Sequence, residues 1–368
     1  MYRHVVVLLL LFAAAPAFAL QTPTVNPQPD LSLLWTQVQR QPDDFTVSCI
    51  PLNSPANAVY YRPDAAQPVA SVGKLLIFIE YTWQVFNGVL SNDEMISIDE
   101  LNWYDLERTD GGAHQRFLAT YPNTTQAISL WDIASRGMMQ YSSNAASDYI
   151  LLRLGQVDWT RWTRTLRLTN TTPPHSLTLI PIMMGNHETG ELTDADVVSA
   201  ALFDSAQTFL TRFITDAQWH EAELLYRQLP RRGFPSWEVQ GRILNLYTMS
   251  GTTRDFTNVL AAIYAESSPL PERMRQLLRA GLRWTENAAI NNTYFEYGSK
   301  LGFYSGGTLA LVAYGYPFEG QPVISAMFFR NIPRDIYRDM LNQDSIGDLA
   351  HWVNLNGCNG LASRLPRA

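Results

Sequence analysis

The sequence predicts an α+β protein, in which an antiparallel sheet of two N-terminal and three C-terminal strands packs with a helical subdomain. Apolar residues alternate with a period of two near both ends of the chain, whereas helical periodicity fills its middle. The composition agrees, because 46% of the residues are hydrophobic and 12% are aromatic, which is typical of a domain with a large core.

Residues 1–19 are typical of a secretory signal peptide: Arg3 is positive, 5–15 is apolar, and 17–19 supplies small residues for cleavage. The apolar run is shorter than a membrane span, and no later segment approaches ~20 uninterrupted apolar residues. We therefore expect an exported protein, periplasmic or secreted, with one domain over 20–368. No stable membrane anchor is expected after the signal is cleaved.

The N-terminal half is predicted to contain, in order, a helix over 31–41, strands over 45–52 and 58–62, a helix from Ser71, and helices on both sides of a break within 128–154. The helix from Ser71 is apolar on all sides, as expected of a helix buried in a core.

The C-terminal half is predicted to begin with a helix capped by Thr252, whose hydroxyl precedes an acidic first turn. Beyond Asn292 the period-two pattern predicts strands over 294–303, 308–316 and 323–331. One final helix is predicted over 334–353.

Charge and cysteine content narrow the class of protein. The net charge is −7 and no basic run occurs, which argues against nucleic acid as a partner. Cys49 and Cys358 are the two cysteines. An oxidising compartment would allow them to pair, but two unpaired thiols fit the sequence equally well.

Ser71 and Lys74 are three residues apart, so on a helix they share one face. A nucleophilic serine needs a nearby base, and an amine in an apolar surrounding favours its neutral, basic form. The pair alone is weak evidence for a catalytic site, because the same pattern fits a helix-capping serine and a surface lysine.

Two further motifs follow in order: Ser142-Ser143-Asn144 after a helix, and Lys300-Leu301-Gly302 in the first C-terminal strand. With this trio the chain resembles the penicilloyl serine transferases, whose class A β-lactamases and penicillin-binding proteins carry Ser-x-x-Lys, Ser-Asp-Asn and Lys-Thr-Gly. The resemblance covers nearly the whole mature chain and implies the β-lactamase/transpeptidase-like fold.

The resemblance also implies roles for the motif residues. Ser71 would be the nucleophile, Lys74 the proton acceptor or relay, and Ser142 the donor to the leaving group. Substrate-binding roles would fall to Asn144, Lys300, Gly302 and Tyr304, with backbone N–H groups of Ser71 and of a residue near Tyr304 forming the oxyanion hole.

Three positions depart from the family pattern. Ser143 replaces an Asp, which the wider group tolerates. Leu301 replaces the hydroxyl residue of Lys-Thr-Gly, and Phe303 stands where carboxylate-binding members place Ser or Thr. Both changes argue against strong recognition of a substrate carboxylate.

No Glu-x-x-Leu-Asn string occurs, so the base that would activate water for deacylation is not obvious. Glu238 is the nearest candidate for this base. The alternative is that Glu238 is an ordinary solvated residue of a helix. Relative to a compact class A enzyme the middle of the chain is longer, which predicts a helical insertion around 169–236 that forms a lid or cleft wall.

We expect an exported serine hydrolase that acts through an acyl-enzyme on Ser71, with β-lactamase-like amide hydrolysis as the first interpretation. The alternatives are D-alanyl-D-alanine peptidase or esterase activity, or a penicillin-binding and cell-wall-sensing protein without turnover. The partner would be a β-lactam, a cell-wall peptide or an ester. No cofactor is expected, and no metal, since His187-Glu188 lacks the second His of a zinc motif.

Overall fold

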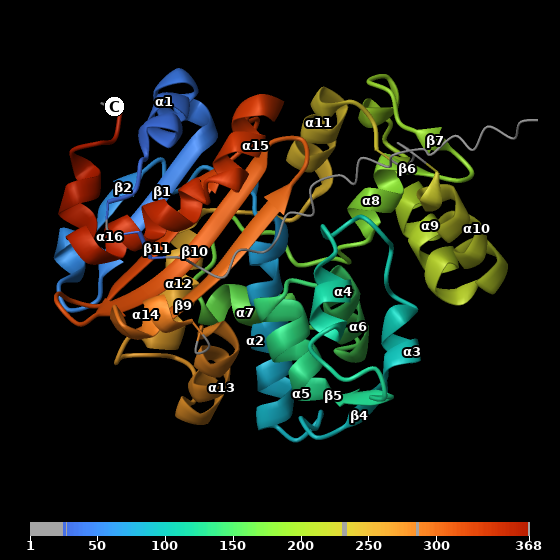
Figure 1. The fold of residues 1–368 in the computed structure, drawn as a ribbon, viewed down its shortest axis with the longest axis horizontal. Coiled ribbons are helices and arrows are strands. Elements are labelled where there is room, and N and C mark those ends of the chain that lie inside the picture. Colours follow the sequence, from blue (N-terminus) through green and yellow to red (C-terminus); the bar gives the residue numbers. More distant parts are fainter. Residues whose placement is uncertain (1–24, 27, 230–233, 285–286, 367–368) are drawn as a thin grey trace, which may run out of the picture.

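The computed structural model describes residues 25–26, 28–229, 234–284 and 287–366. A five-stranded antiparallel sheet in the order β2-β1-β11-β10-β9 forms its centre (Figure 1). Its strands are β1 (Phe45–Pro51), β2 (Val59–Tyr61), β9 (Tyr294–Tyr304), β10 (Thr308–Pro317) and β11 (Val323–Phe329). The predicted fold class and the predicted strands are confirmed.

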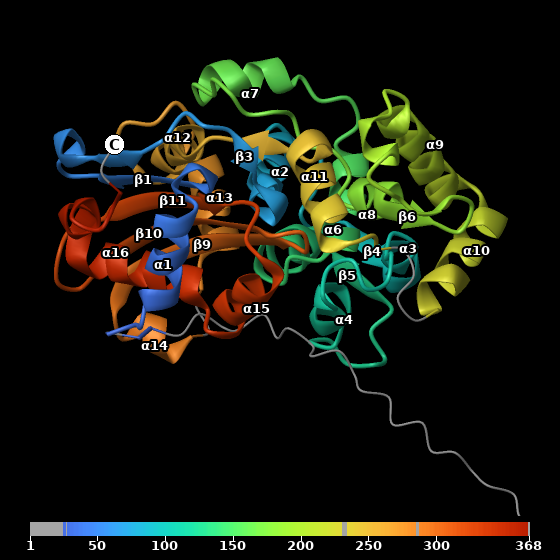
Figure 2. The same ribbon diagram turned by 90° about the horizontal axis from the view of Figure 1, so that it is seen from above.

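Helices cover both faces of this sheet (Figure 2). On one face lie α1 (Ser32–Arg40), α15 (Arg334–Asn342) and α16 (Ser345–Ala362); on the other lie α2 (Lys74–Phe86), α12 (Thr253–Tyr264) and α13 (Glu272–Leu282). Side chains alternate along a strand, so neighbouring residues of β10 enter different cores. Leu309 and Leu311 pack between the sheet and α1, α15 and α16, whereas Ala310 and Val312 pack between the sheet and α2, α12 and α13.

The helical subdomain surrounds α2, whose residues from Lys74 to Thr82 are all buried. A π-helix over Ile133–Gln140 and α6 (Asn144–Arg153) flank the predicted break. The smaller elements are β3 (Gln67–Pro68), β4 (Met95–Ser97), α3 (Ile98–Asn102), α4 (Ala113–Leu118), β5 (Ala127–Ser129), α5 (Leu130–Asp132), α7 (Trp159–Thr165), α11 (Trp237–Tyr247), β8 (Ser250–Gly251) and α14 (Ala288–Asn291).

The segment 169–236 is folded where the structure describes it. It contains α8 (Leu179–Met184), the short strands β6 (Gly185–Asn186) and β7 (Gly190–Glu191), α9 (Leu202–Thr215) and α10 (Ala217–Gln228). Helices α9 and α10 lie side by side at the end of the molecule far from α16 (Figures 1 and 2). Two small clusters of buried side chains join this segment to its neighbours.

The prediction of one final helix over 334–353 is wrong, because the chain forms α15 and α16 with a break between them. Asp344 stands at this break with φ at 51°, a left-handed conformation that ends a helix and that Asp tolerates better than most residues. Helix α16 then continues beyond Val353 to Ala362, past the non-helical Gly357.

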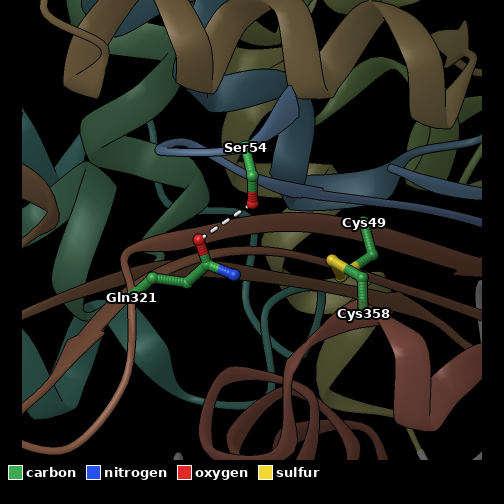
Figure 3. Close-up of a disulfide and its surroundings, with 4 residues drawn as sticks. All are labelled: Cys49, Ser54, Gln321 and Cys358. Carbon is green, nitrogen blue, oxygen red and sulfur yellow. Dashed lines mark hydrogen bonds between the residues drawn. A yellow bond between two sulfur atoms is a disulfide. The ribbon is translucent and has the colours of Figure 1, made fainter. Parts of the chain in front are cut away.

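A disulfide joins Cys49 on β1 to Cys358 in α16 (Figure 3). Residues 1–19, the predicted signal peptide, lie outside the described part of the chain. None of the helices in the described part is both long and apolar enough to cross a membrane.

Candidate active site

Ser71 lies in a 3₁₀ turn, Ala70–Gly73, that leads directly into α2. Val69, directly before the turn, donates its N–H to the carbonyl of Met249, directly before β8, at 3.1 Å. Ala70 has φ at 46°, an unfavourable conformation for a residue with a Cβ, and such strain is stored where the surrounding structure enforces it. Ser71 is half-buried on this sharp turn, three residues before α2 begins.

Lys74 is the first residue of α2 and its side chain is fully buried. Its Nζ donates to the Ser142 carbonyl at 2.6 Å and to Asn144 Oδ1 at 2.9 Å, and lies 3.3 Å from Ser142 Oγ. Burial lowers the pKa of Lys74 to about 7, although the carboxylates of Asp110 and Asp148 oppose this shift. The amine is thus available as a base near neutral pH.

The turn of the second motif connects the π-helix to α6. Ser142 has φ at 66°, again left-handed, and its Oγ accepts from Lys300 Nζ at 2.7 Å. Ser143 caps α6, because its Oγ accepts from the Ala146 N–H at 3.0 Å. This turn consequently presents Ser142 Oγ between the two lysine amines.

The edge strand β9 closes the site from the sheet side. Lys300 is buried, and burial together with the charge of Lys74 holds its pKa well below the ordinary value. At Gly302 a Cβ atom would lie 2.8 Å from the Ser71 nitrogen and 2.6 Å from the Val69 carbonyl oxygen. Only glycine lets the strand approach the Ser71 turn this closely.

A small pocket opens at Ser71, lined by Ser71, Thr109, Asp110, Ser142, Asn144, Phe303 and Tyr304. The structure thereby brings together the predicted site residues of all three motifs and places Tyr304 beside them. Sequence reasoning missed Thr109 and Asp110. The available signal was Asp110-Gly111-Gly112 directly before a helix, a pattern typical of a helix start.

The comparisons with known proteins agree with this geometry. The profile of the Beta-lactamase enzyme family matches residues 34–353. This chain belongs to that family. A comparison with curated proteins finds no match.

Solved β-lactamases have the same fold as this β-lactamase family member. A β-lactamase from Xanthomonas campestris has a TM-score of 0.53 at 15% identity, covering 89% of this chain and 97% of its own. A protein named PBP-A has a TM-score of 0.52 at 15% identity, and the match covers 91% of this chain and 100% of that protein. A class A β-lactamase from Mycobacterium abscessus has a TM-score of 0.50 at 14% identity, and the match covers 86% of this chain and 97% of that enzyme.

Lys74, Lys300 and Gly302 contact the residues that line the pocket, whereas Glu238 of this family member neither lines it nor belongs to one of the three motifs. It lies in the first turn of α11 with an exposed side chain, and it is not among the residues lining the pocket. Helix α11 itself is close, since a Cβ on its Gly241 would lie 2.9 Å from the Gly306 carbonyl in the β9–β10 turn. The helix therefore covers the end of the hairpin while Glu238 faces outward.

The two departures on β9 have a structural role in this family member. Leu301 and Phe303 are both partly buried and pack against the core that contains α1, α15 and α16. Phe303 also contributes to the lining of the pocket. At these two positions β9 thus has apolar side chains, whereas the family pattern has hydroxyl groups that can donate hydrogen bonds to a substrate carboxylate.

The described residues contain no group of three His, Cys, Asp or Glu side chains suited to a metal ion. His187, whose pair with Glu188 lacks the second His of a zinc motif, places its Nδ1 3.0 Å from Glu223 Oε2.

Proposed function

We propose that this protein is an exported serine hydrolase in which Ser71 forms an acyl-enzyme and Lys74 accepts the Ser71 proton. The observation that carries the proposal is the convergence of a buried amine, Lys74, with the hydroxyl of Ser142 and the amide of Asn144 beside the Ser71 pocket. These residues come from different elements, so their meeting depends on the whole fold.

The arrangement supports a simple sequence of proton transfers. Neutral Lys74 donates its two N–H bonds to the Ser142 carbonyl and to Asn144, and its lone pair can accept the proton of Ser71 Oγ as that oxygen attacks a carbonyl carbon. The proton then passes through Ser142 Oγ to the leaving nitrogen or oxygen, while Lys300 Nζ donates to Ser142 Oγ and orients it. Water finally hydrolyses the acyl-enzyme.

The oxyanion would be stabilised by backbone N–H groups. We assign these to Ser71 and Tyr304, because β9 runs against the Ser71 turn at Gly302 and Tyr304 lines the same pocket. Asn144 would hold the amide of the substrate side chain.

The experiment that tests this function is intact-mass analysis after treatment with a fluorophosphonate and, separately, with a penicillin. We expect one covalent adduct, which Ser71→Ala abolishes. Ser305→Ala is the matched control, because Ser305 is exposed in the turn that follows β9 and should leave the adduct unchanged. An adduct that survives Ser71→Ala refutes the assignment.

The substrate class follows from β9. Leu301 and Phe303 supply no hydroxyl donors, and an unpaired carboxylate in a closed site costs about 1–3 kcal/mol, roughly 5- to 150-fold in binding. We therefore expect weak turnover of β-lactams and relatively better acylation by esters that lack a neighbouring carboxylate. A panel of a chromogenic cephalosporin, a D-Ala-D-Ala peptide and a short-chain p-nitrophenyl ester ranks these substrates.

The variant Leu301→Thr with Phe303→Ser should raise acylation by penicillins, since it restores donors beside the scissile amide. Acylation by the neutral ester is the internal control and should not rise. Equal acylation by penicillin in the variant and the parent, with the variant folded, contradicts this interpretation of the strand.

One observation favours a second candidate, a penicillin-binding and cell-wall-sensing protein without turnover. Among the pocket-lining residues Asp110 is the carboxylate, and its oxygens already accept from the backbone N–H groups of residues 112, 113, 114 and 144. A carboxylate engaged in this way is a poor base for water. Steady turnover of any substrate in the panel excludes this candidate, whereas a stable adduct with a single burst of product supports it.

A further inference from the structure

His114 on α4 occupies a buried position directly behind the second motif. Its side chain is 1% exposed, and its Nδ1 lies 2.9 Å from Ser143 Oγ. Its Nε2 lies 2.9 Å from Asn102 Oδ1, at the end of α3. His114 thus connects the end of α3 to Ser143, the residue before α6. It does not line the Ser71 pocket itself.

The hydrogen-bond partners determine which ring nitrogen carries the proton. Asn102 Oδ1 only accepts, so Nε2 must donate to it. Ser143 Oγ already accepts from the Ala146 N–H, and its own proton is satisfied if Nδ1 accepts it. The neutral Nε2–H tautomer is the assignment in which each of these polar atoms has a partner.

Ser143 transmits this contact to the catalytic turn. Its N–H donates to the Gly137 carbonyl at 2.8 Å, and its own carbonyl accepts from Ser147 Oγ at 2.6 Å and lies 3.4 Å from Lys74 Nζ. The neighbouring Ser142 is held in a left-handed conformation. A rotation of the Ser143 side chain would break the helix cap, and the turn that this cap holds carries the backbone carbonyls that accept from Lys74.

Asp110 supports the same turn from the loop before α4. One carboxylate oxygen accepts from the N–H groups of His114 and Asn144, at 3.1 and 3.2 Å. The start of α4 and the start of α6 are thereby joined through one side chain. His114 and Asp110 together attach Ser143 and Asn144 to α4.

We propose that His114 is a positioning residue, which holds the Ser143 hydroxyl and through it keeps the Ser142–Asn144 turn in the geometry that Lys74 requires. The effect on catalysis rests on the proposed function, but the tautomer and the helix cap do not.

The surroundings of His114 keep it neutral over a wide pH range. Burial lowers its pKa to about 4, and Asp110 is the charged neighbour that opposes this. The other titratable or charged side chains on elements packed around it are Lys74, Asp99, Glu100, Tyr104, Asp105, Glu107, Arg108, Arg116, Arg136, Asp148, Tyr149 and Arg153. Protonation at Nδ1 would turn this acceptor into a donor and leave the Ser143 proton without its partner.

The first test does not depend on activity. In ¹⁵N-histidine spectra of the full chain we expect His114 as the Nε2–H tautomer, neutral down to a pH near 4. An Nδ1–H tautomer, or titration near the ordinary value of 6.5, overturns the proposal. Because no substrate is involved, this result stands whether or not Ser71 is the nucleophile.

The second test uses a matched pair of variants. His114→Asn keeps an acceptor near the position of Nδ1, whereas His114→Gln keeps a donor near the position of Nε2 but removes that acceptor. We expect His114→Gln to speed hydrogen exchange of the Ala146 amide and to slow labelling of Ser71 by a fluorophosphonate, by roughly 10-fold. His114→Asn should restore most of both properties.

Coupling to Ser143 separates a positioning role from a merely structural one. Ser143→Ala should slow labelling about as much as His114→Gln, and the double variant should be no slower than either single variant. Effects that multiply, or a Ser143→Ala protein that labels at the parent rate, overturn the proposal. If the parent protein shows no labelling of Ser71 at all, the proposed function fails, and exchange at Ala146 still decides the role of His114.

Discussion

The side chain of Lys74 makes the proposed reaction depend on pH. Its pKa is lowered to about 7, so the neutral form increases as the pH rises through that value. The labelling rate of Ser71 should therefore rise about tenfold per pH unit below 7 and level off above it.

A time course of fluorophosphonate labelling at a series of pH values measures this profile. Lys74→Ala should lower the rate by ~10²- to 10⁴-fold and remove the rise. Lys74→Arg is the matched charge-retaining control and should behave like Lys74→Ala, because a guanidinium stays protonated. A flat profile in the parent protein contradicts the assignment of Lys74 as the base.

Motif spacing predicts some site residues and not others. Ser71, Lys74, Ser142 and Lys300 follow from short patterns in a fixed order, since their chemistry requires particular side chains. Asp110 and His114 act on backbone N–H groups and on one hydroxyl, which any of several residue types could do. Their roles therefore depend on the tertiary contacts between α4 and α6, which a local sequence pattern does not predict.

Helices α9 and α10 contact the loop that leads to the pocket. Trp103, which follows α3, stacks on His220 of α10 with ring centroids 4.0 Å apart, and its Nε1 donates to the Ile214 carbonyl at 2.8 Å. Three residues later, Leu106 is buried in a small cluster with Phe213 and Trp219. The loop then continues to Thr109 and Asp110, so we propose that the helical pair supports this wall of the pocket.

Trp103→Ala should loosen the loop. We expect faster hydrogen exchange over residues 103–112, slower labelling of Ser71, and a loss of about 3 kcal/mol in the free energy of unfolding. Trp103→Phe keeps a ring to stack on His220 but removes the bond to Ile214, so its effects should be intermediate. Parent-like exchange and labelling in Trp103→Ala mean that the helical pair does not support the pocket.

At the level of elements the sequence predicts strands better than helix breaks. The strands β9, β10 and β11 carry a period-two pattern that ends at glycine-rich turns, so their limits are encoded locally. The break at Asp344 is different, because it falls in a polar run, 342–345, between the buried Met340 and Ile346, and a polar run of this length also fits the exposed face of one continuous helix. Similarly, the Ser71 turn over Ala70–Gly73 is 3₁₀ rather than α-helical, and it directly follows β3, which pairs with the distant β8.

The disulfide acts on the whole molecule, since Cys49 and Cys358 are 309 residues apart. Such a bond restricts the unfolded chain far more than the folded one, and its removal typically costs about 2–5 kcal/mol. We expect Cys49→Ala with Cys358→Ala to lower the free energy of unfolding by this amount in denaturant titrations, because both positions are buried and alanine adds no polar group.

The denaturant dependence should become steeper in this variant, since the unfolded chain without a cross-link exposes more surface. The parent protein under reducing conditions is the matched comparison and should unfold like the double variant. Equal unfolding free energies with and without the bond contradict this account.

The same bond closes residues 49–358 into one covalent ring. A protease that cuts once at an exposed loop between Cys49 and Cys358 opens the ring but releases no fragment. The cut protein keeps its mass on a gel without reductant and separates into two pieces only when reductant is added. Cys358 also lies on the last helix, so the ring can close only after almost all of the chain has been made.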